Sequence, residues 1–465
     1  MSVPAGPGHP DVPLPTPAAD PGAPPPSGLR RAIAPLGQPA YRRLAIALVL
    51  STFAGGVWAI AIVWEVIRFG GGPGQLSLVA TAGTLGVVLA ALLGGVVADR
   101  VPQKLILLAV AGLETLGMAL AAALSALDRD GPWPLAVITF GLGVAMAFYY
   151  PAYSAWLPSL VPAEQLQAVN GFEGMIRPGL HQAIGPAVAG AVVAALNPAA
   201  AMTIAVIASA LGLLALATVP RTAVRRDLTD TQDHAVGAVL RDLREAVRYL
   251  VTTSWLFATL VFASLMILVM MGPLEVLIPF LIKDHLGGGP RDHSYLLAAF
   301  GVGAALGSLV MAARPMPRHY LTSMILMWGA ACLPFALIAT TDHMAVVVAS
   351  GLVMGVLFGA PQVIWGTLLQ RRVPSHMLGR VASLDFFVSI ALMPASMALA
   401  GPVSHVIGLH NTFFIAALAP IVFAIAAIVL PGLMRDEVAH PIDLGPDGSP
   451  AQTAGVSDDN QVTRP

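Results

Sequence analysis

The sequence contains few charged residues and a single cysteine, and each shortage excludes a class of protein. Only 11% of its 465 residues are Asp, Glu, Lys or Arg, whereas soluble domains carry about 25%. A formal net charge of −1 provides no basic surface for a nucleic acid. Cys332 stands alone in an apolar run, which excludes an internal disulfide and indicates a small buried side chain.

Motifs that carry enzyme chemistry are also lacking. No glycine-rich loop ends in Lys and Ser or Thr, so nothing in the chain matches a site for nucleotide phosphates. The His and Cys residues are not paired at the spacings of metal ligands, and the isolated Ser, His and Asp residues have no catalytic context. We therefore expect no enzyme activity, no cofactor and no bound metal.

Long apolar segments, in contrast, are abundant. Apolar residues make up 57% of the chain, and a membrane-spanning helix needs about 20 of them in a row. Twelve segments qualify, at residues 43–67, 76–98, 104–127, 133–157, 166–196, 199–219, 255–282, 294–313, 320–341, 343–369, 378–407 and 411–434. They are too long and too uniformly apolar for the strands of a membrane barrel. The sequence predicts an all-α membrane protein with twelve transmembrane helices.

Polar segments divide the chain into five parts. Residues 1–40 hold 12 of the 39 prolines and few large apolar side chains, and we interpret them as a disordered tail. Residues 41–219 and 255–435 form two halves of six spans each. Between them, residues 220–254 form a linker in which "VLRDLREAVRYLV" predicts an amphipathic helix on the membrane surface. The last part, 436–465, is again polar and is predicted to be a tail.

The basic residues predict the orientation of the chain. An even number of spans places both termini on one side, and 19 of the 24 Lys and Arg residues fall on that side. Cytoplasmic loops carry an excess of Lys and Arg. We therefore expect a multi-pass protein of the cell (inner) membrane with both termini in the cytoplasm.

The two halves contain a sequence repeat. "VPAEQLQAVNGFE" ends at Glu173 in the first half, and "VPSHMLGRVASLD" ends at Asp385 in the second. Each copy opens the fifth span of its half. The matched positions are Leu166 and Leu378, Val169 and Val381, and Glu173 and Asp385. Parallel repeats of six helices are typical of transporters whose site lies between two rocking halves.

The stretch "GGVVADRVPQK", residues 94–104, carries a family resemblance. Gly95, Asp99, Arg100 and Lys104 match the loop between the second and third spans of the major facilitator superfamily, although Pro102 replaces a usual glycine. "VWAIAIVWEV", "PAYSAWLPSLVPAEQLQAVN", "LRDLREAVRYL" and "LGRVASLDFFVSIALMPASMALAGP" resemble its bacterial drug- and siderophore-exporter branch. The resemblance covers residues 43–434.

This resemblance implies a cytoplasmic gate. Asp99 would face the positive N-terminus of the eleventh span near Leu378, and Arg100 and Arg380 would add charged pairs. Such contacts would hold the cytoplasmic side shut and break when the halves rock. Alternatively, these side chains only anchor the helices at the membrane interface.

Charged side chains within spans are costly in lipid and therefore indicate function. Because the resemblance places the seventh span on the central cavity, Glu275 is the first candidate for a proton or cation site. Arg177 follows Glu173 by four residues, the spacing of a structural ion pair. Asp385 and Glu114 are further candidates, although the third span, which holds Glu114, usually supports the outside of the bundle.

The fifth span carries a partial match to the helix-bending motif of antiporters in this superfamily. Gly185, Pro186 and Gly190 match it, whereas His181 stands where the motif has an earlier glycine. Pro186 is expected to kink the helix so that it seals the seam between the halves. We interpret His181 and His405 as ordinary buried or interfacial histidines.

Together these features predict a secondary active transporter that exports amphipathic small molecules, of drug or siderophore type, by alternating access driven by protons. The partners would be the small-molecule substrate, protons and the lipid bilayer, and we expect a monomer. Uptake of a nutrient by the same fold stays open, as does a membrane sensor or partner protein that transports nothing.

Overall fold

The computed structural model describes residues 34–162, 165–220, 235–314, 316–374, 377–429 and 433–440. Within these ranges the regular secondary structure is helical throughout. The all-α fold predicted from the apolar segments is confirmed.

The spans of the first half begin with α2 and end with α8. Their bounds are α2 Pro39–Arg68, α3 Pro73–Arg100, α4 Gln103–Ala126, α5 Pro132–Trp156, α6 Leu166–Pro178, the π-helical η4 Gly179–Ile184, α7 Gly185–Ala195 and α8 Pro198–Ala217. The linker helix is α9, Ala235–Thr252.

The spans of the second half run from α10 to α18, and a short helix, α19, follows them. Their bounds are α10 Ser254–Gly272, the π-helical η5 Pro273–Leu277, α11 Ile278–Phe280, the π-helical η6 Leu281–His285, α12 Pro290–Ala312, α13 Tyr320–Ala330, α14 Pro334–Thr340, α15 Met344–Arg372, α16 Leu378–Ala391, α17 Met393–Ile407, α18 Leu409–Val429 and α19 Leu433–Ala439.

Eleven helices in the described ranges are long and apolar enough to cross a membrane. The twelfth predicted span, 166–196, corresponds to α6, η4 and α7, which follow one another without a break. Glu173, Arg177 and His181 make its first half too polar to be counted by apolar length alone. The predicted count of twelve therefore holds only when this interrupted helix is included.

Prolines account for several interruptions of the spans. A proline has no N–H to donate within a helix and clashes with the preceding turn. Pro178 precedes the π-helical η4, Pro273 opens η5, and Pro334 opens α14 after a turn at 331–333. Single π-helical turns are rare and often lie at functional sites, which draws attention to η4 and η5.

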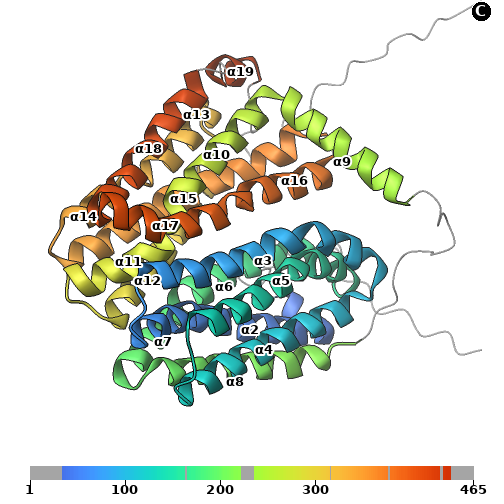
Figure 1. Ribbon diagram of the computed structural model, residues 1–465. Helices are drawn as coiled ribbons and strands as arrows, with labels where there is room; N and C mark the ends of the chain where they lie inside the picture. The colour runs from blue at the N-terminus through green and yellow to red at the C-terminus, as the bar shows by residue number, and fades with distance from the viewer. Residues whose placement is uncertain are drawn as a thin grey trace, which may run out of the picture.

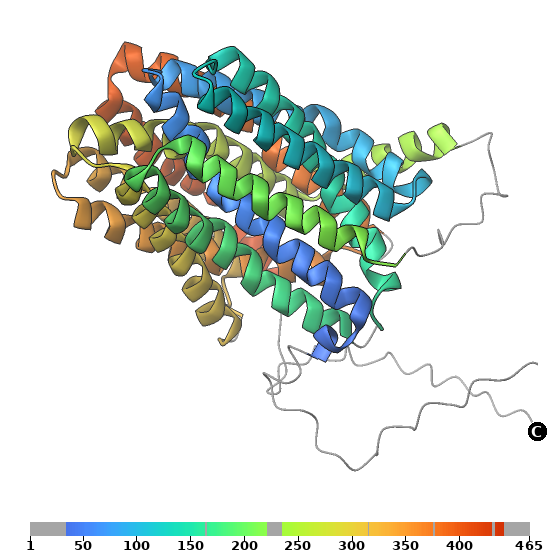
Figure 2. The same cartoon turned by 90° about the horizontal axis from the view of Figure 1, so that it is seen from below.

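The helices form two groups that follow the order of the chain. Figure 1 shows α2 to α8, blue to green, on one side and α10 with α13 to α18, yellow to red, on the other. In the view from below, the blue and green helices run side by side along their lengths (Figure 2).

The two groups meet most closely at the end of the bundle where α2 ends and α3 begins, here called the far end. There α3 packs against α17, and α7 packs against α12. A methyl group on Gly401 would lie 2.9 Å from Oγ of Ser77, and one on Gly190 would lie 2.7 Å from the carbonyl oxygen of Pro290. Only glycine permits this approach, so backbone-level packing closes the far end.

Two predicted boundaries were wrong. The first span begins at Pro39 instead of residue 43, with Tyr41 fully buried. Asp436–Ala439, assigned to the C-terminal tail, instead belongs to α19, in which Glu437 is buried. The described part of the linker contains α9 as expected. The rest of both predicted tails, 1–33 and 441–465, lies outside the described residues.

Candidate functional site

A cluster of acid, base and tyrosine side chains lies where the start of α2 and the end of α5 meet α6. Nη2 of Arg177 is 3.3 Å from Oε2 of Glu173, so the predicted ion pair is present. The hydroxyl of Tyr41 donates to Oε1 of Glu173 over 3.5 Å, and the hydroxyl of Tyr153 donates to the same oxygen. Glu173 is buried and fully supplied with partners.

Tyrosine rings surround the guanidinium of Arg177. Its central carbon lies 5.5, 5.4 and 5.1 Å from the ring centroids of Tyr149, Tyr150 and Tyr153. A cation over an aromatic face is stabilised by the ring quadrupole. Because Arg177 also pairs with Glu173, this cation is neutralised and held in place within the first half.

The second half contains a corresponding cluster around Asp385 of α16. Nε1 of Trp365 on α15 donates to Oδ2 of Asp385 over 3.1 Å, and the Ser389 hydroxyl lies 3.5 Å from Oδ1. The Trp365 ring makes edge contacts with Trp255 and Trp328, at centroid distances of 6.1 and 6.4 Å. Asp385 is partly exposed.

The two clusters occupy matching positions of the sequence repeat. In each half an aromatic side chain donates a hydrogen bond to the acid that lies twenty residues later in the chain, Tyr153 to Glu173 and Trp365 to Asp385. Four residues after the acid, the first half has Arg177 and the second has Ser389. The halves therefore share an architecture but differ by one cation.

A cavity of about 290 Å³ adjoins the first cluster. Its wall includes Met146, Tyr149 and Tyr150 as apolar and aromatic surface, and Glu114 and Arg177 as charged groups. Ligand sites of this kind combine a mostly apolar lining with a few placed polar groups. The wall reaches α2, α4, α5 and the α6–η4 junction, so four spans shape it.

His181 of η4 occupies an unexpected place in this cavity. A methyl group on Gly55 would lie 3.2 Å from Nδ1 of His181, and one on Gly56 would lie 2.8 Å from the His181 carbonyl oxygen. The two first-span glycines thus let η4 approach α2 closely. His181 is exposed on the cavity wall instead of buried, and His405 is also exposed.

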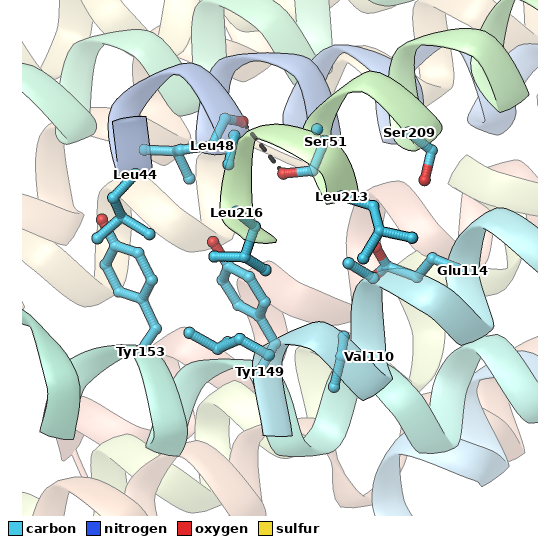
Figure 3. A pocket seen from close by; sticks show the side chains of 14 residues that line it. Leu44, Leu48, Ser51, Val110, Glu114, Tyr149, Tyr153, Ser209, Leu213 and Leu216 are labelled. Atoms are coloured by element: carbon cyan, nitrogen blue, oxygen red, sulfur yellow. Dashed lines mark hydrogen bonds between the residues drawn. The ribbon is translucent and has the colours of Figure 1, made fainter. Parts of the chain in front are cut away.

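A smaller hollow of about 30 Å³ lies deeper in the first half, between α2, α4, α5 and α8. Figure 3 shows the Glu114 side chain reaching into it near Leu213, with Tyr149 on the opposite wall. Glu114, Ser51 and Tyr149 line both the hollow and the larger cavity. The third span therefore brings Glu114 to interior space, whereas the resemblance implied a position on the outer support of the bundle.

Glu275 lies in η5, next to the far-end seam. Its neighbours in the chain, Val276 and Leu277, are fully buried, whereas the Glu275 side chain is exposed. It makes no hydrogen bond or ion pair to any residue that the structure describes. It does not line the cavity at Arg177, and η5 packs against α3, α17 and α18.

The structure describes only part of the expected gate. Gly95, Asp99 and Arg100 belong to α3, and their side chains lie outside the description. Nζ of Lys104 donates to the carbonyl oxygens of Ala217, at 2.8 Å, and of Val219, at the end of α8. Arg380 pairs with Glu245 of α9 at 3.1 Å. Lys104 therefore caps a helix of its own half.

The bend residues of the fifth span serve helix contacts. A methyl group on Gly185 would lie 2.8 Å from the Gly56 backbone, so this position packs α7 against α2. Pro186 is buried at the start of α7, directly after η4. Gly190 faces Ser294 and Pro290 of α12, on the other half.

Two acids escaped the sequence analysis. Glu65, fully buried at the end of α2, shares Arg68 with Asp128 and Asp130, at N–O distances of 3.0, 2.8 and 3.1 Å. Glu437 of α19 is equally buried. Glu65 and Arg68 lie three residues apart, and this spacing could have indicated their ion pair from the sequence.

Buried Glu437 binds the start of α13. It accepts hydrogen bonds from the backbone N–H groups of Leu321 and Thr322 at 3.0 and 3.1 Å, and from the Thr322 hydroxyl at 2.7 Å. Such N–H groups at a helix start need partners.

No cluster of three or more His, Cys, Asp or Glu residues in the described ranges could hold a metal ion.

Comparison with solved structures shows the fold. The nucleoside transporter NupG superposes with a TM-score of 0.61 at 15% identity, covering 86% of this chain and 98% of that one. A POT family transporter in complex with 5-aminolevulinic acid gives 0.65 at 13% identity, covering 84% and 96%. Identities this low establish a shared architecture only.

Sequence comparison finds nearer relatives. The multidrug efflux pump Tap of Mycobacterium tuberculosis (strain ATCC 25618 / H37Rv) is 28% identical over 413 residues, or 86% of this chain and 95% of that protein. Macrolide efflux protein A of Streptococcus pyogenes is 25% identical over 384 residues, covering 81% and 92%. The family model described as transmembrane secretion effector matches residues 30–441. The chain is thus a multi-pass membrane transporter of the major facilitator superfamily and belongs to the transmembrane secretion effector family.

Proposed function

We propose that this protein is a proton-driven exporter of amphipathic small molecules of drug type. The observation that carries this proposal is the cavity of about 290 Å³ inside the membrane bundle, which combines aromatic and apolar walls with ionisable side chains. An amphipathic molecule needs both kinds of surface. The efflux activities named for two relatives support the same direction of transport.

Transport would follow from rocking of the two halves, residues 41–219 and 255–435, about the linker 220–254. With both termini in the cytoplasm, the far end faces the outside. The glycine contacts there then represent a state closed to the outside. In the opposite state these contacts separate, and the contacts expected of Asp99 and Arg100 near the start of α16 form.

Proton coupling requires ionisable groups whose protonation favours one of the two states. Glu275 and Glu114 are acids in spans without an ion-pair partner among the described residues. Glu275 lies beside the far-end seam, where a proton would enter from outside, and we assign it that role. Glu173 and Arg177 neutralise each other and shape the cavity wall.

Everted membrane vesicles test the function directly. Vesicles containing the protein are expected to accumulate a fluorescent amphipathic dye when respiration acidifies their interior, and to release it when a protonophore is added. Vesicles prepared from the same strain without the protein provide the control. Dye accumulation that is unaffected by the protonophore would contradict proton coupling, and absence of any accumulation across a panel of drugs and dyes would contradict export.

A growth screen distinguishes the substrate class. Expression in a strain lacking its own pumps is expected to raise the tolerated concentration of some drugs at least about fourfold, because active efflux lowers their internal level. Uptake of a nutrient would instead improve growth at limiting nutrient concentration.

A single band of monomer mass after cross-linking in membranes would support the monomer that we expect.

A further inference from the structure

Acids within the spans fall into two groups according to their partners. Glu65 pairs with Arg68, and Glu173 pairs with Arg177. Asp385 has no cationic partner among the described residues, although its carboxylate is held by two hydrogen bonds. An acid held in a fixed orientation without a counter-charge is the arrangement expected of a binding site.

The internal repeat shows what is missing beside Asp385. At the matching place in the first half, the guanidinium of Arg177 lies 3.3 Å from Glu173. Ser389 holds the corresponding position four residues after Asp385, and its hydroxyl is 3.5 Å from the carboxylate. The first half therefore carries a cation of its own where the second half carries none.

Aromatic side chains border both places. Three tyrosine rings lie within 5.5 Å of the Arg177 guanidinium carbon. In the second half, Trp365 contacts both the acid and Trp328, whose buried Nε1 has no hydrogen-bond partner among the described residues. An aromatic environment thus borders the acid carboxylate in both halves.

Two arginines of α15 and α16 pair with acids other than Asp385. On the elements packed against α16, the titratable residues with described side chains are Arg244, Glu245, Arg248 and Tyr249 on α9, Arg371 and Arg372 on α15, and His405 on α17. The same elements also carry Arg241 and Asp242 on α9 and Asp99 and Arg100 on α3, whose side chains lie outside the description. Arg372 pairs with Asp436 at 2.6 Å and lies over Trp255. Arg380, on α16 itself, pairs with Glu245.

We propose that Asp385 binds a monovalent cation during transport, at the place that the Arg177 guanidinium fills in the first half. The cation is either a proton or the ammonium group of a substrate. This inference rests on the proposed transport function and assigns a second charged site to it. Binding neutralises Asp385, so that α16 can change its surroundings in the rocking motion without carrying an uncompensated charge into an apolar seam.

The first half of the chain suggests the decisive substitution for the second half. Ser389→Arg places a guanidinium four residues after the acid, the spacing of Arg177 and Glu173, and the partly exposed Ser389 site offers room for it. The built-in cation would compete with the transported one. Ser389→Gln is the control, because it adds a long polar side chain without charge. Asp385→Asn removes the proposed ligand itself.

Two fluorescent probes in proteoliposomes identify the cation. Dansylcadaverine carries an ammonium group, and its N-acetyl derivative is the neutral counterpart. We expect Ser389→Arg and Asp385→Asn to reduce gradient-driven uptake of dansylcadaverine roughly tenfold or more, whereas Ser389→Gln stays within about twofold of the wild type. Counterflow exchange without a gradient reports whether each variant is folded and able to move substrate.

The pattern across the probes separates the two sources. If the proton binds at Asp385, both probes lose gradient-driven uptake and keep counterflow. If the substrate ammonium binds there, dansylcadaverine loses uptake and fluorescence-detected binding, while the neutral derivative keeps both. Uptake by Ser389→Arg equal to that of Ser389→Gln would overturn the inference, as would full gradient-driven uptake of both probes by Asp385→Asn. A wild type that moves neither probe but exports other drugs would refute the site and not the function.

Discussion

The backbone N–H of Gly401 donates a hydrogen bond of 2.9 Å to Oγ of Ser77 and thereby joins the eleventh span to the second. In the opposite seam, Gly190 of the fifth span lies against Ser294 of the eighth. Each serine lies four residues after the proline that opens its helix, Pro73 or Pro290. A glycine–serine contact therefore closes each of the two seams at the far end.

Substitution of these glycines tests the seam. Gly190→Leu and Gly401→Leu cannot fit the closed far end, and overpacking costs about 1–3 kcal/mol. The equilibrium would shift roughly 5- to 150-fold towards the outward-open state. A cysteine introduced by Tyr150→Cys in a Cys332→Ala background should then react faster with an impermeant thiol reagent added from outside.

Gly112→Leu is the matched control for the seam, because a methyl group there would meet no atom within 4 Å. Its labelling rate and transport rate should equal those of the wild type. Unchanged labelling in both seam variants would show that the far end does not open during transport.

Asp99→Asn tests the gate implied by the family resemblance. The carboxylate at the end of α3 is expected to stabilise the cytoplasmically closed state by facing the N-terminus of α16, an interaction worth about 0.3–1 kcal/mol at an exposed helix end and up to about 2 kcal/mol when partly buried. Loss of the charge should lower the transport rate several-fold while the protein still reaches the membrane, as measured by dye efflux normalised to protein content. Wild-type efflux would leave Asp99 with an anchoring role only.

Most of the fold could be predicted from the sequence because lipid imposes a simple requirement. A segment of about 20 apolar residues can satisfy its backbone only as a helix, so spans such as α8 and α18 appear directly as apolar runs. The fifth span was also found among the apolar segments, although the polar Glu173 and Arg177 interrupt it, and the repeat with residues 373–385 agrees with its start.

The site could be predicted only where local spacing carries the signal. Glu173 and Arg177 lie four residues apart, and their ion pair follows from helix geometry. The bonds of Glu437 to Leu321 and of Trp365 to Asp385 join segments distant in sequence. The place of Glu114 beside a cavity depends on the rotation of α4 about its axis, which a uniformly apolar helix does not reveal.

Arg177→Gln is expected to destabilise the protein. It leaves Glu173 charged among Tyr41 and Tyr153 with no counter-ion, and breaking a buried pair typically costs about 3–5 kcal/mol. The midpoint of thermal unfolding in detergent should fall clearly, and the double variant Glu173→Gln with Arg177→Gln should recover much of the loss. A double variant less stable than the single one would show that the tyrosine contacts of Arg177, and not its charge pairing, dominate.

Glu437→Ala tests the contact between α19 and the start of α13. The substitution leaves the N–H groups of Leu321 and Thr322 without their acceptor, at a cost of about 1–3 kcal/mol. Thermal unfolding should begin at a lower temperature. Val438→Ala, at a neighbouring position that is 65% exposed, is the control and should leave the unfolding midpoint unchanged. Equal midpoints for the two variants would refute a stabilising role of α19.

Glu275→Gln tests the outer proton site. Glu275 lies in the π-helical η5 between buried neighbours, exposed itself and without a partner among the described residues, at the seam that opens outwards. A neutral side chain there cannot release a proton, so the link between the gradient and the movement of the halves is lost. We expect gradient-driven export in everted vesicles to fall by at least about tenfold, while drug binding to the purified protein changes less than about twofold. Glu275→Asp keeps the charge and should retain partial export.

Asp284→Asn, nine residues later in the chain, removes an exposed carboxylate that pairs with Lys283 and serves as the control. Export by Glu275→Gln at the wild-type rate would exclude Glu275 and leave Asp385 and Glu114 as the acids that couple transport to the gradient.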